Sequence, residues 1–140
     1  MDYYSYEGFT TTPFKVAVTR EMIADYARSI EETESLFFNY KEAINKGYAD
    51  IPAPPCMPMI FWQYIKVPWM NGGDSFIHKY QSINYSEPVM AGQTYTCMIT
   101  LKSVKSKRSF LILDNELVGE NERGKVIFTS NSTLIGEMKK

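Results

Sequence analysis

Apolar positions in the first third of the chain recur at the spacing of an α-helix. Four apolar residues at positions i, i+3, i+4 and i+7 share one helical face: Ile23, Tyr26, Ala27 and Ile30. Thr19 stands directly before this stretch and is a residue type that caps helix N-termini. The pattern therefore predicts an amphipathic helix that begins just after Thr19.

The middle of the chain is rich in proline and then apolar. Residues 52–55 read Pro-Ala-Pro-Pro, which predicts an extended connection because proline disfavours helix in the residue before it. Pro58 suits the first position of a helix, and the residues from there to Pro68 are apolar except for Gln63 and Lys66. A helix that is apolar on almost every side is expected to be covered by protein on most of them.

The second half of the chain alternates with a period of two residues. Strands are expected at residues 75–85, 94–104, 109–118 and 125–135. In the second of these segments one face is apolar and the other is rich in threonine: Tyr95, Cys97, Ile99 and Leu101 against Thr94, Thr96, Met98 and Thr100. Short breaks permit hairpins between the strands. We expect an antiparallel meander that follows one buried helix, the α+β arrangement called a hot-dog fold.

The composition is that of a globular chain with many aromatic residues. The 140 residues are 44% hydrophobic and 22% charged, which suits one domain over residues 1–140 and argues against disorder. Aromatic residues make up 14%, which favours an aromatic core, an oligomer interface or both. The net charge is -1 and basic residues gather only in the short stretch 105–108, so no nucleic-acid partner is expected.

Other features bear on ligands and on location. Cys56 and Cys97 give neither a disulfide framework nor metal-site spacing. His78 is the one histidine, whereas a typical zinc site needs several His, Cys or carboxylate ligands together. No metal ion or cofactor is therefore expected. The first residues lack the basic and apolar regions of a signal peptide, so none is expected, and the longest nearly apolar stretch, residues 53–62, is too short to span a membrane. We expect a cytoplasmic protein with no membrane partner.

Four short motifs occur in order along the chain. They are Tyr-Ala-Arg-Ser-Ile at residues 26–30, Ala-Pro-Pro at 53–55, Ile-His-Lys-Tyr-Gln at 77–81 and Glu-Pro-Val-Met-Ala-Gly-Gln at 87–93. Together they resemble the N-terminal MaoC-like dehydratase domain, also described as the dehydratase region of fungal-type fatty-acid synthase. The resemblance covers nearly the whole chain. It implies a hot-dog dimer that hydrates trans-2-enoyl thioesters of coenzyme A or acyl-carrier protein to (R)-3-hydroxyacyl thioesters, or runs the reverse dehydration.

The family's catalytic signature, Gly-Asp-x-Asn-Pro-Leu-His, follows the first helix and falls on residues 31–37. The resemblance places Glu32 at the catalytic aspartate and Phe37 at the catalytic histidine. The reaction needs a carboxylate and an imidazole that exchange protons with a water molecule and the α-carbon, and a phenyl ring cannot transfer a proton. The resemblance therefore implies the acyl-thioester-binding half of a two-subunit enzyme, or else a self-sufficient homodimer that uses Glu32.

Each candidate residue also has a purely structural interpretation. Glu32 is either a general base or a solvated loop carboxylate among acidic neighbours. His78 is the only imidazole, and it is either a hydrogen-bonded strand or interface residue or, in a self-sufficient enzyme, the partner of Glu32 across a dimer interface. Cys56 is either a nucleophile or a small hydrophobe.

The resemblance places the family's substrate-lining loop at residues 53–55. Free amides at the start of the following helix could receive a thioester carbonyl. The residues expected to contact the acyl chain, or else to be ordinary core, are Ala53, Pro54, Pro55, Cys56, Met57, Met59, Phe61, Trp62 and Phe37. Basic residues within 105–108 and Arg123 could meet the phosphates of coenzyme A or an acidic carrier-protein helix, or could be solubilising charges.

Two further functions stay open. A hot-dog acyl-CoA thioesterase commonly places a carboxylate on or beside the central helix, whereas here the helix offers only Gln63 and Asp50 lies before the proline loop. A non-catalytic acyl-CoA sensor or scaffold would need a separate partner for its output. A dimer is expected in every case because the edge strands of the sheet must be covered. The second subunit is either an identical copy or a catalytic MaoC-like subunit.

Overall fold

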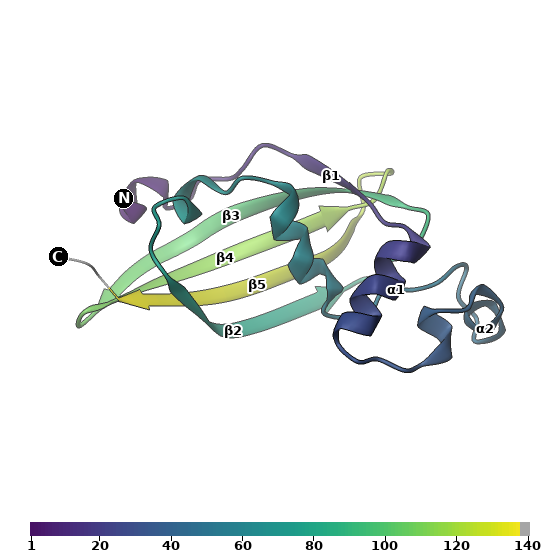
Figure 1. The fold of residues 1–140 in the computed structure, drawn as a ribbon. Coiled ribbons are helices and arrows are strands. Elements are labelled where there is room, and N and C mark those ends of the chain that lie inside the picture. The colour runs from purple at the N-terminus through teal and green to yellow at the C-terminus, as the bar shows by residue number, and fades with distance from the viewer. Residues whose placement is uncertain (138–140) are drawn as a thin grey trace.

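The structure is a computed structural model that describes residues 1–137. Its strands form an antiparallel sheet in the order β1-β3-β4-β5-β2 (Figure 1). The strands are β1 (Phe14–Ala17), β2 (Phe76–Tyr85), β3 (Thr94–Lys107), β4 (Phe110–Glu120) and β5 (Val126–Glu137). The sequence pattern predicted a single meander, in which consecutive strands lie next to each other. That order is wrong for the first long strand, β2, which does not lie next to β3. β2 pairs with β5 at one edge of the sheet, and the short strand β1 pairs with β3 at the other.

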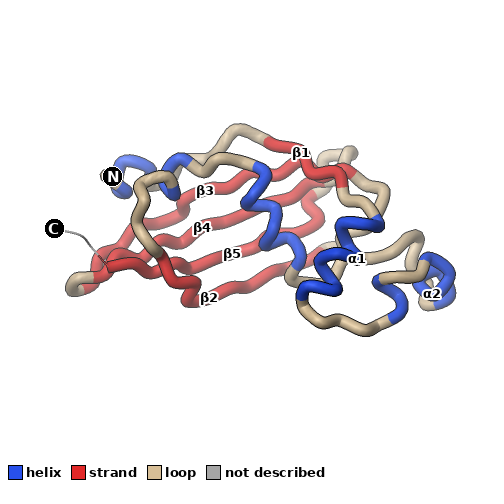
Figure 2. The backbone as a smooth tube through the Cα atoms, in the orientation of Figure 1, coloured by secondary structure: helices blue, strands red, loops and turns tan. Residues whose placement is uncertain are grey.

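The helices lie on one face of this sheet (Figure 2). They are η1 (Tyr3–Tyr6), α1 (Arg20–Ser29), η2 (Ser35–Phe37), α2 (Tyr40–Asn45), η3 (Met57–Tyr64) and η4 (Pro68–Met70), where η marks a 3₁₀ helix. The predicted cap of α1 is confirmed, since the Thr19 side chain accepts a hydrogen bond from the Met22 amide at 3.0 Å. Ile23 and Ala27 on the predicted apolar face are fully buried.

The central helix η3 crosses the sheet in Figure 1 and differs from the helix that the sequence predicted. It is a 3₁₀ helix whose amide–carbonyl bonds join residues three apart, as from Met59 to Cys56 at 3.1 Å. Met57 and Phe61 are fully buried, whereas Tyr64 is 45% exposed. Within one chain, therefore, the helix is covered on its sheet side and is open on part of its outer side.

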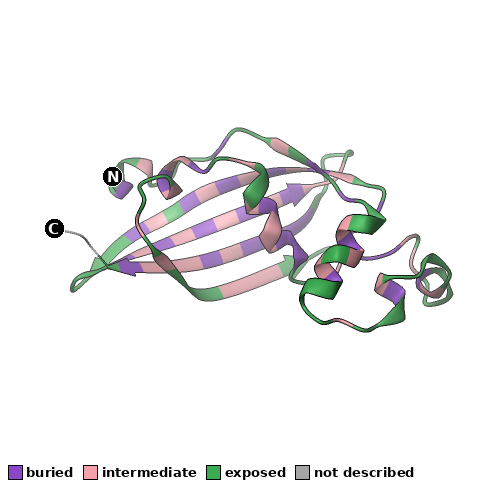
Figure 3. Cartoon of the chain, in the orientation of Figure 1, coloured by how far each residue is buried: buried purple, intermediate pink, exposed green. Residues whose placement is uncertain are grey.

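The alternation of β3 places the core as the sequence predicted. Its apolar face is buried at every position: Tyr95, Cys97, Ile99 and Leu101. The opposite face, from Thr94 to Thr100, is half-buried instead of fully exposed. Figure 3 shows the same alternation of buried and half-buried positions along β3, β4 and β5. The core lies between this buried face and η3, where the ring of Phe61 packs edge-on against Phe128 with centroids 5.9 Å apart.

None of the helices described in residues 1–137 combines the length and the hydropathy that a membrane crossing requires.

Candidate functional site

A mostly apolar pocket of about 400 Å³ lies where η3 begins. We call it the apolar pocket. Its lining comes from η2, from the proline loop at residues 52–55, from Tyr48, from Tyr85 at the end of β2 and from the segment 86–89 that follows it. The sheet, the proline loop and the 3₁₀ turn after α1 meet here although they are far apart in the sequence.

Backbone hydrogen bonds hold the proline loop against the segment that follows β2. The Ala53 amide donates to the Val89 carbonyl at 2.7 Å, and the Ala91 amide donates to the Ile51 carbonyl at 2.9 Å. Proline restricts the backbone further because its ring fixes φ. The wall of the apolar pocket is therefore built in advance of any ligand.

Tyr85 fastens the same loop from the end of β2. Its hydroxyl donates a hydrogen bond to the Pro55 carbonyl oxygen. Burial raises the pKa of the Tyr85 phenol above its ordinary value, and the nearby Cys56 and Tyr26 raise that pKa further. The phenol is thus held protonated as a donor. No local sequence pattern indicates this contact, because the two residues are 30 positions apart.

The ionisable side chains that line the apolar pocket are Tyr48, Tyr85 and Glu87. The Glu87 carboxylate lies 3.3 Å from the Lys125 ammonium, and both side chains are about half exposed. Among the described lining residues none is a histidine. The pocket itself therefore lacks the imidazole that the family's proton transfers require.

Three of the nine residues that the sequence proposed for substrate binding line this pocket: Phe37, Ala53 and Pro55. The other six are not among its lining residues. Pro54, Met57 and Phe61 are buried, Met59 and Trp62 are half-buried on η3, and Cys56 is exposed where η3 begins. The ring of Phe37 thus takes a place in the wall of the cavity at the position where the resemblance puts the catalytic imidazole.

Fewer amides are free to bind a ligand at the start of η3 than the sequence predicted. Three of the residues in this turn are prolines without an N–H. The Met57 amide donates to the Pro54 carbonyl at 3.0 Å, and the Met59 amide donates to the Cys56 carbonyl at 3.1 Å. Among the residues that the structure describes, this leaves the Cys56 amide as the one donor of the turn without an acceptor in the chain.

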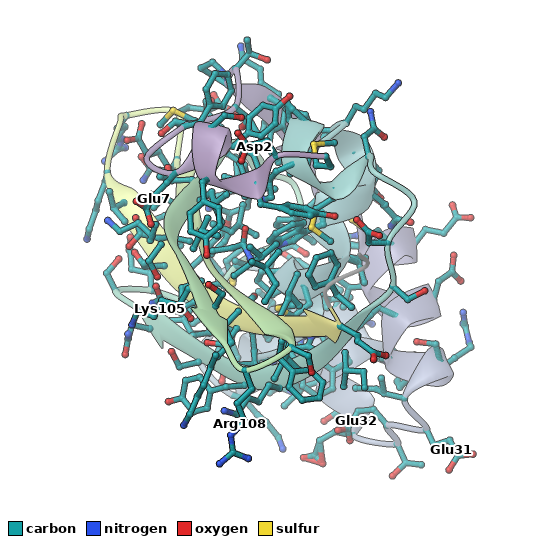
Figure 4. The ribbon with its side chains drawn as sticks, turned by 90° about the vertical axis from the view of Figure 1, so that its left-hand side faces the viewer. Asp2, Glu7, Glu31, Glu32, Lys105 and Arg108 are labelled. Carbon is teal, nitrogen blue, oxygen red and sulfur yellow. The ribbon has the colours of Figure 1, made fainter. Side chains whose placement is uncertain are left out.

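Glu32 lies outside the lining of the apolar pocket, in the loop that follows α1. Its Oε1 atom accepts hydrogen bonds from the amides of Thr33 and Glu34, each at 3.0 Å. Figure 4 shows Glu31 and Glu32 pointing outward from this loop. In one chain, then, the carboxylate of Glu32 stabilises its own turn.

His78 lies near the start of β2, and Figure 1 shows that β2 starts at the end of the sheet away from α1. The structure of one chain does not bring His78 and Glu32 together, so their pairing across a dimer interface stays a prediction. A bulge between His78 and Tyr80 lets His78 and Gln81 share a face, with His78 Nε2 2.8 Å from Gln81 Oε1. Gln81 in turn bonds the hydroxyls of Ser130 and Ser132. These contacts suit a hydrogen-bonded strand residue.

Within residues 1–137 no three His, Cys, Asp or Glu side chains are grouped so that they could hold a metal ion.

A curved antiparallel sheet that carries a central helix, with a pocket at the start of that helix, defines a hot-dog protein. Residues 5–130 match the family model described as "FAS1-like, dehydratase domain region". A UPF0336 protein of Thermobifida fusca is 30% identical over 131 residues, which cover 88% of this chain and 85% of that protein. The chain belongs to the FAS1-like dehydratase-region family.

Solved structures agree on the fold. The HadBC (3R-hydroxyacyl-ACP dehydratase) complex from Mycobacterium tuberculosis contains a chain with a TM-score of 0.84 and 22% identity, covering 94% of this chain and 97% of that chain. A chain of the ChsH1-ChsH2 complex from the same organism has a TM-score of 0.72 and 18% identity, covering 95% of this chain and 98% of that chain. A MaoC-like dehydratase from Rhodospirillum rubrum has a TM-score of 0.73 and 14% identity, covering 96% of this chain and 94% of that chain. The α+β hot-dog fold is confirmed, and the family model confirms the resemblance to a fatty-acid synthase dehydratase region.

Proposed function

We propose that this chain is the acyl-thioester-binding subunit of a MaoC-like hydratase or dehydratase, and that a partner subunit supplies the catalytic aspartate and histidine. The substrates are trans-2-enoyl or (R)-3-hydroxyacyl thioesters of coenzyme A or acyl-carrier protein. One observation carries the proposal. Phe37 lines the apolar pocket at the position of the family's imidazole, and His78, near the start of β2, is not among the residues that line that pocket.

The apolar pocket suits a binding role. Its wall is largely apolar and is fixed by the Tyr85–Pro55 and Ala53–Val89 hydrogen bonds, so an acyl thioester would displace water without reorganising the loop. The Cys56 amide lies where η3 begins and is the donor of this turn that is left for a thioester carbonyl. Such an amide orients the ligand, whereas the transfer of protons to and from water requires groups from elsewhere.

The free edge of β2 supports a partner subunit of the same fold. β2 ends the sheet on this side, and within the described residues nothing pairs with its outer edge. Ile77 is 72% exposed and Tyr80 is 60% exposed. An edge that combines unpaired backbone groups with large exposed side chains is typically covered by another strand. The HadBC and ChsH1-ChsH2 structures, which are complexes of named subunits, support a partner that is not identical.

The alternative functions find less support in the geometry. A self-sufficient hydratase would have to free Glu32 from the two amides that its carboxylate accepts. A thioesterase would need a carboxylate beside η3, but Asp50 is held by Arg20 through two hydrogen bonds of 3.0 and 3.1 Å. These bonds lower the pKa of Asp50, and its carboxylate is engaged in structure.

The test is reconstitution. The chain would be purified alone and with a MaoC-like subunit that carries the complete Gly-Asp-x-Asn-Pro-Leu-His signature, and hydration of a trans-2-enoyl-CoA would be followed by loss of enoyl absorbance. We expect a stable complex whose turnover exceeds that of either subunit alone by about 10² or more, the range attributed to general acid–base catalysis in a completed site. Replacing the partner's signature histidine by alanine is the control and should abolish turnover. A chain that forms no complex and leaves the partner's rate unchanged would overturn the proposal.

A further inference from the structure

A second pocket adjoins the apolar pocket and differs from it in chemistry. It has a volume of about 720 Å³ and a more polar lining, and we call it the polar pocket. Tyr48, Glu87 and Pro88 line both pockets. A ligand that extends out of the apolar pocket past these three residues therefore enters the polar pocket. The far wall of the polar pocket is the β4–β5 hairpin, residues 121–125.

Two cations of this hairpin, Arg123 and Lys125, line the polar pocket. Lys125 forms an ion pair with Glu87 at 3.3 Å, and both partners are more than half exposed. Such a surface pair contributes little free energy, so Lys125 can turn to another anion at small cost. Arg123 has an exposed side chain, and among the described residues no ion pair engages its guanidinium. The anions of the lining are Glu87, the ion-pair partner of Lys125, and Glu122.

The hairpin that carries these cations is internally fixed. The side-chain oxygen of Asn121 accepts hydrogen bonds from the amides of Arg123 and Lys125, each at 3.0 Å. Gly124 adopts φ +79, a left-handed conformation that favours glycine. The turn itself therefore sets the backbone positions of Arg123 and Lys125 beside the polar pocket, and binding an anion there would order only their side chains.

We propose that Arg123 and Lys125 bind the phosphate of the pantetheine arm on which the acyl thioester is carried. This inference rests on the proposed function, because it takes the acyl group and thioester to lie in the apolar pocket. The arm would cross Tyr48 and Pro88, and its phosphate would meet the guanidinium of Arg123. A planar guanidinium suits a phosphate because it can donate two parallel hydrogen bonds. The same phosphate ester occurs in coenzyme A and in the phosphopantetheine of a carrier protein.

The fold also decides between the two basic groups of the chain. The β4–β5 hairpin lies at the end of the sheet that carries α1 and α2, whereas the β3–β4 hairpin lies at the opposite end (Figure 1). Figure 4 looks from that opposite end and shows Lys105 and Arg108 there. Arg108 therefore lies far from a ligand in either pocket, although the sequence made it as good a candidate as Arg123. It serves as a matched control, since both arginines stand at hairpin turns.

The experiment compares two saturated thioesters that cannot be hydrated, hexanoyl-CoA and hexanoyl-pantetheine, which lacks phosphate. Dissociation constants would be measured by calorimetry for the wild-type chain, Arg123→Gln and Arg108→Gln, after thermal unfolding confirms that each variant is folded. We expect the wild type to bind hexanoyl-CoA roughly tenfold more tightly than hexanoyl-pantetheine, as a charged hydrogen bond implies. Arg123→Gln should remove most of that preference, and Arg108→Gln should keep it.

Each other outcome has a definite meaning. Equal wild-type affinity for the two thioesters would overturn the phosphate site and leave the proposed function standing. Failure to bind either thioester would contradict both. Equal losses for the two thioesters in Arg123→Gln, or equal losses in the two variants, would also overturn the phosphate site. A third ligand, hexanoyl-phosphopantetheine, distinguishes coenzyme A from the phosphopantetheine of a carrier protein as the source of the phosphate. If it binds like hexanoyl-CoA, the contact is to the phosphate that carrier proteins share, and if it binds more weakly, the other phosphates of coenzyme A contribute.

Discussion

The hydroxyl of Tyr85, the last residue of β2, donates a hydrogen bond to the carbonyl of Pro55 directly before the turn into η3. This contact joins the edge strand of the sheet to the loop that walls the apolar pocket. It links the face on which we expect a partner subunit to the cavity in which we expect the acyl thioester. A shift of the edge strand β2 is therefore expected to move the proline loop that walls the apolar pocket.

Replacing Tyr85 by phenylalanine should remove this hydrogen bond and keep the ring. We expect the free energy of unfolding to fall by about 1 kcal/mol, the usual net contribution of one hydrogen bond. Urea denaturation measures it. Tyr64→Phe is the control, because the Tyr64 side chain is 45% exposed and should tolerate the loss of its hydroxyl. An equal effect of the two substitutions would show that the contact with Pro55 contributes nothing specific.

Asn115 and Trp69 form a buried polar pair beneath the helices. The Trp69 indole N–H donates to the Asn115 side-chain oxygen at 2.8 Å, and both residues are almost fully buried. Asn115→Ala should lower the free energy of unfolding by about 2–3 kcal/mol, because it leaves a buried donor without an acceptor. A double-mutant cycle with Trp69→Phe tests the cause. Strictly additive losses would mean that the two side chains do not depend on each other.

The stability of the fold should decline in alkaline solution, partly through Cys97. Burial raises the pKa of its thiol from an ordinary 9.0 to about 12. Between these values the unfolded thiol has lost its proton while the folded thiol keeps it, so rising pH favours unfolding. We expect Cys97 to account for a loss of about 1.4 kcal/mol between pH 8 and pH 10. Urea denaturation of the wild type and of Cys97→Ala over this range measures the contribution. Parallel stability curves would contradict it.

Patterns within a short stretch of sequence predicted those elements whose structure depends on residues close together in the chain. Thr19 and the apolar spacing after it gave the start and the buried face of α1, because capping and helical periodicity act within one or two turns. The alternation from Thr94 to Leu101 gave the buried face of β3 for the same reason. The departure of Phe37 from the family's signature is visible in the sequence alone, whereas its place in the pocket wall depends on the fold.

Pairings between distant segments could not be predicted in this way. The strand Phe14–Ala17 is too short to show a period, and it is a strand because β3 offers it hydrogen-bonding partners. The alternation within β2 does not say that its partner is β5. Tyr85 and Glu87 reach the apolar pocket only because the fold brings their segment against the proline loop. Most of the candidate site is therefore a product of tertiary structure.

The most direct test of the central claim is a turnover assay on the chain alone. Hydration of a chain-length series of trans-2-enoyl-CoA thioesters would be followed by loss of enoyl absorbance, beside calorimetric binding of the matching saturated thioesters. With Phe37 in place of an imidazole, we predict binding without turnover. Turnover that is abolished by Glu32→Gln would contradict this account and would identify the chain as a complete hydratase.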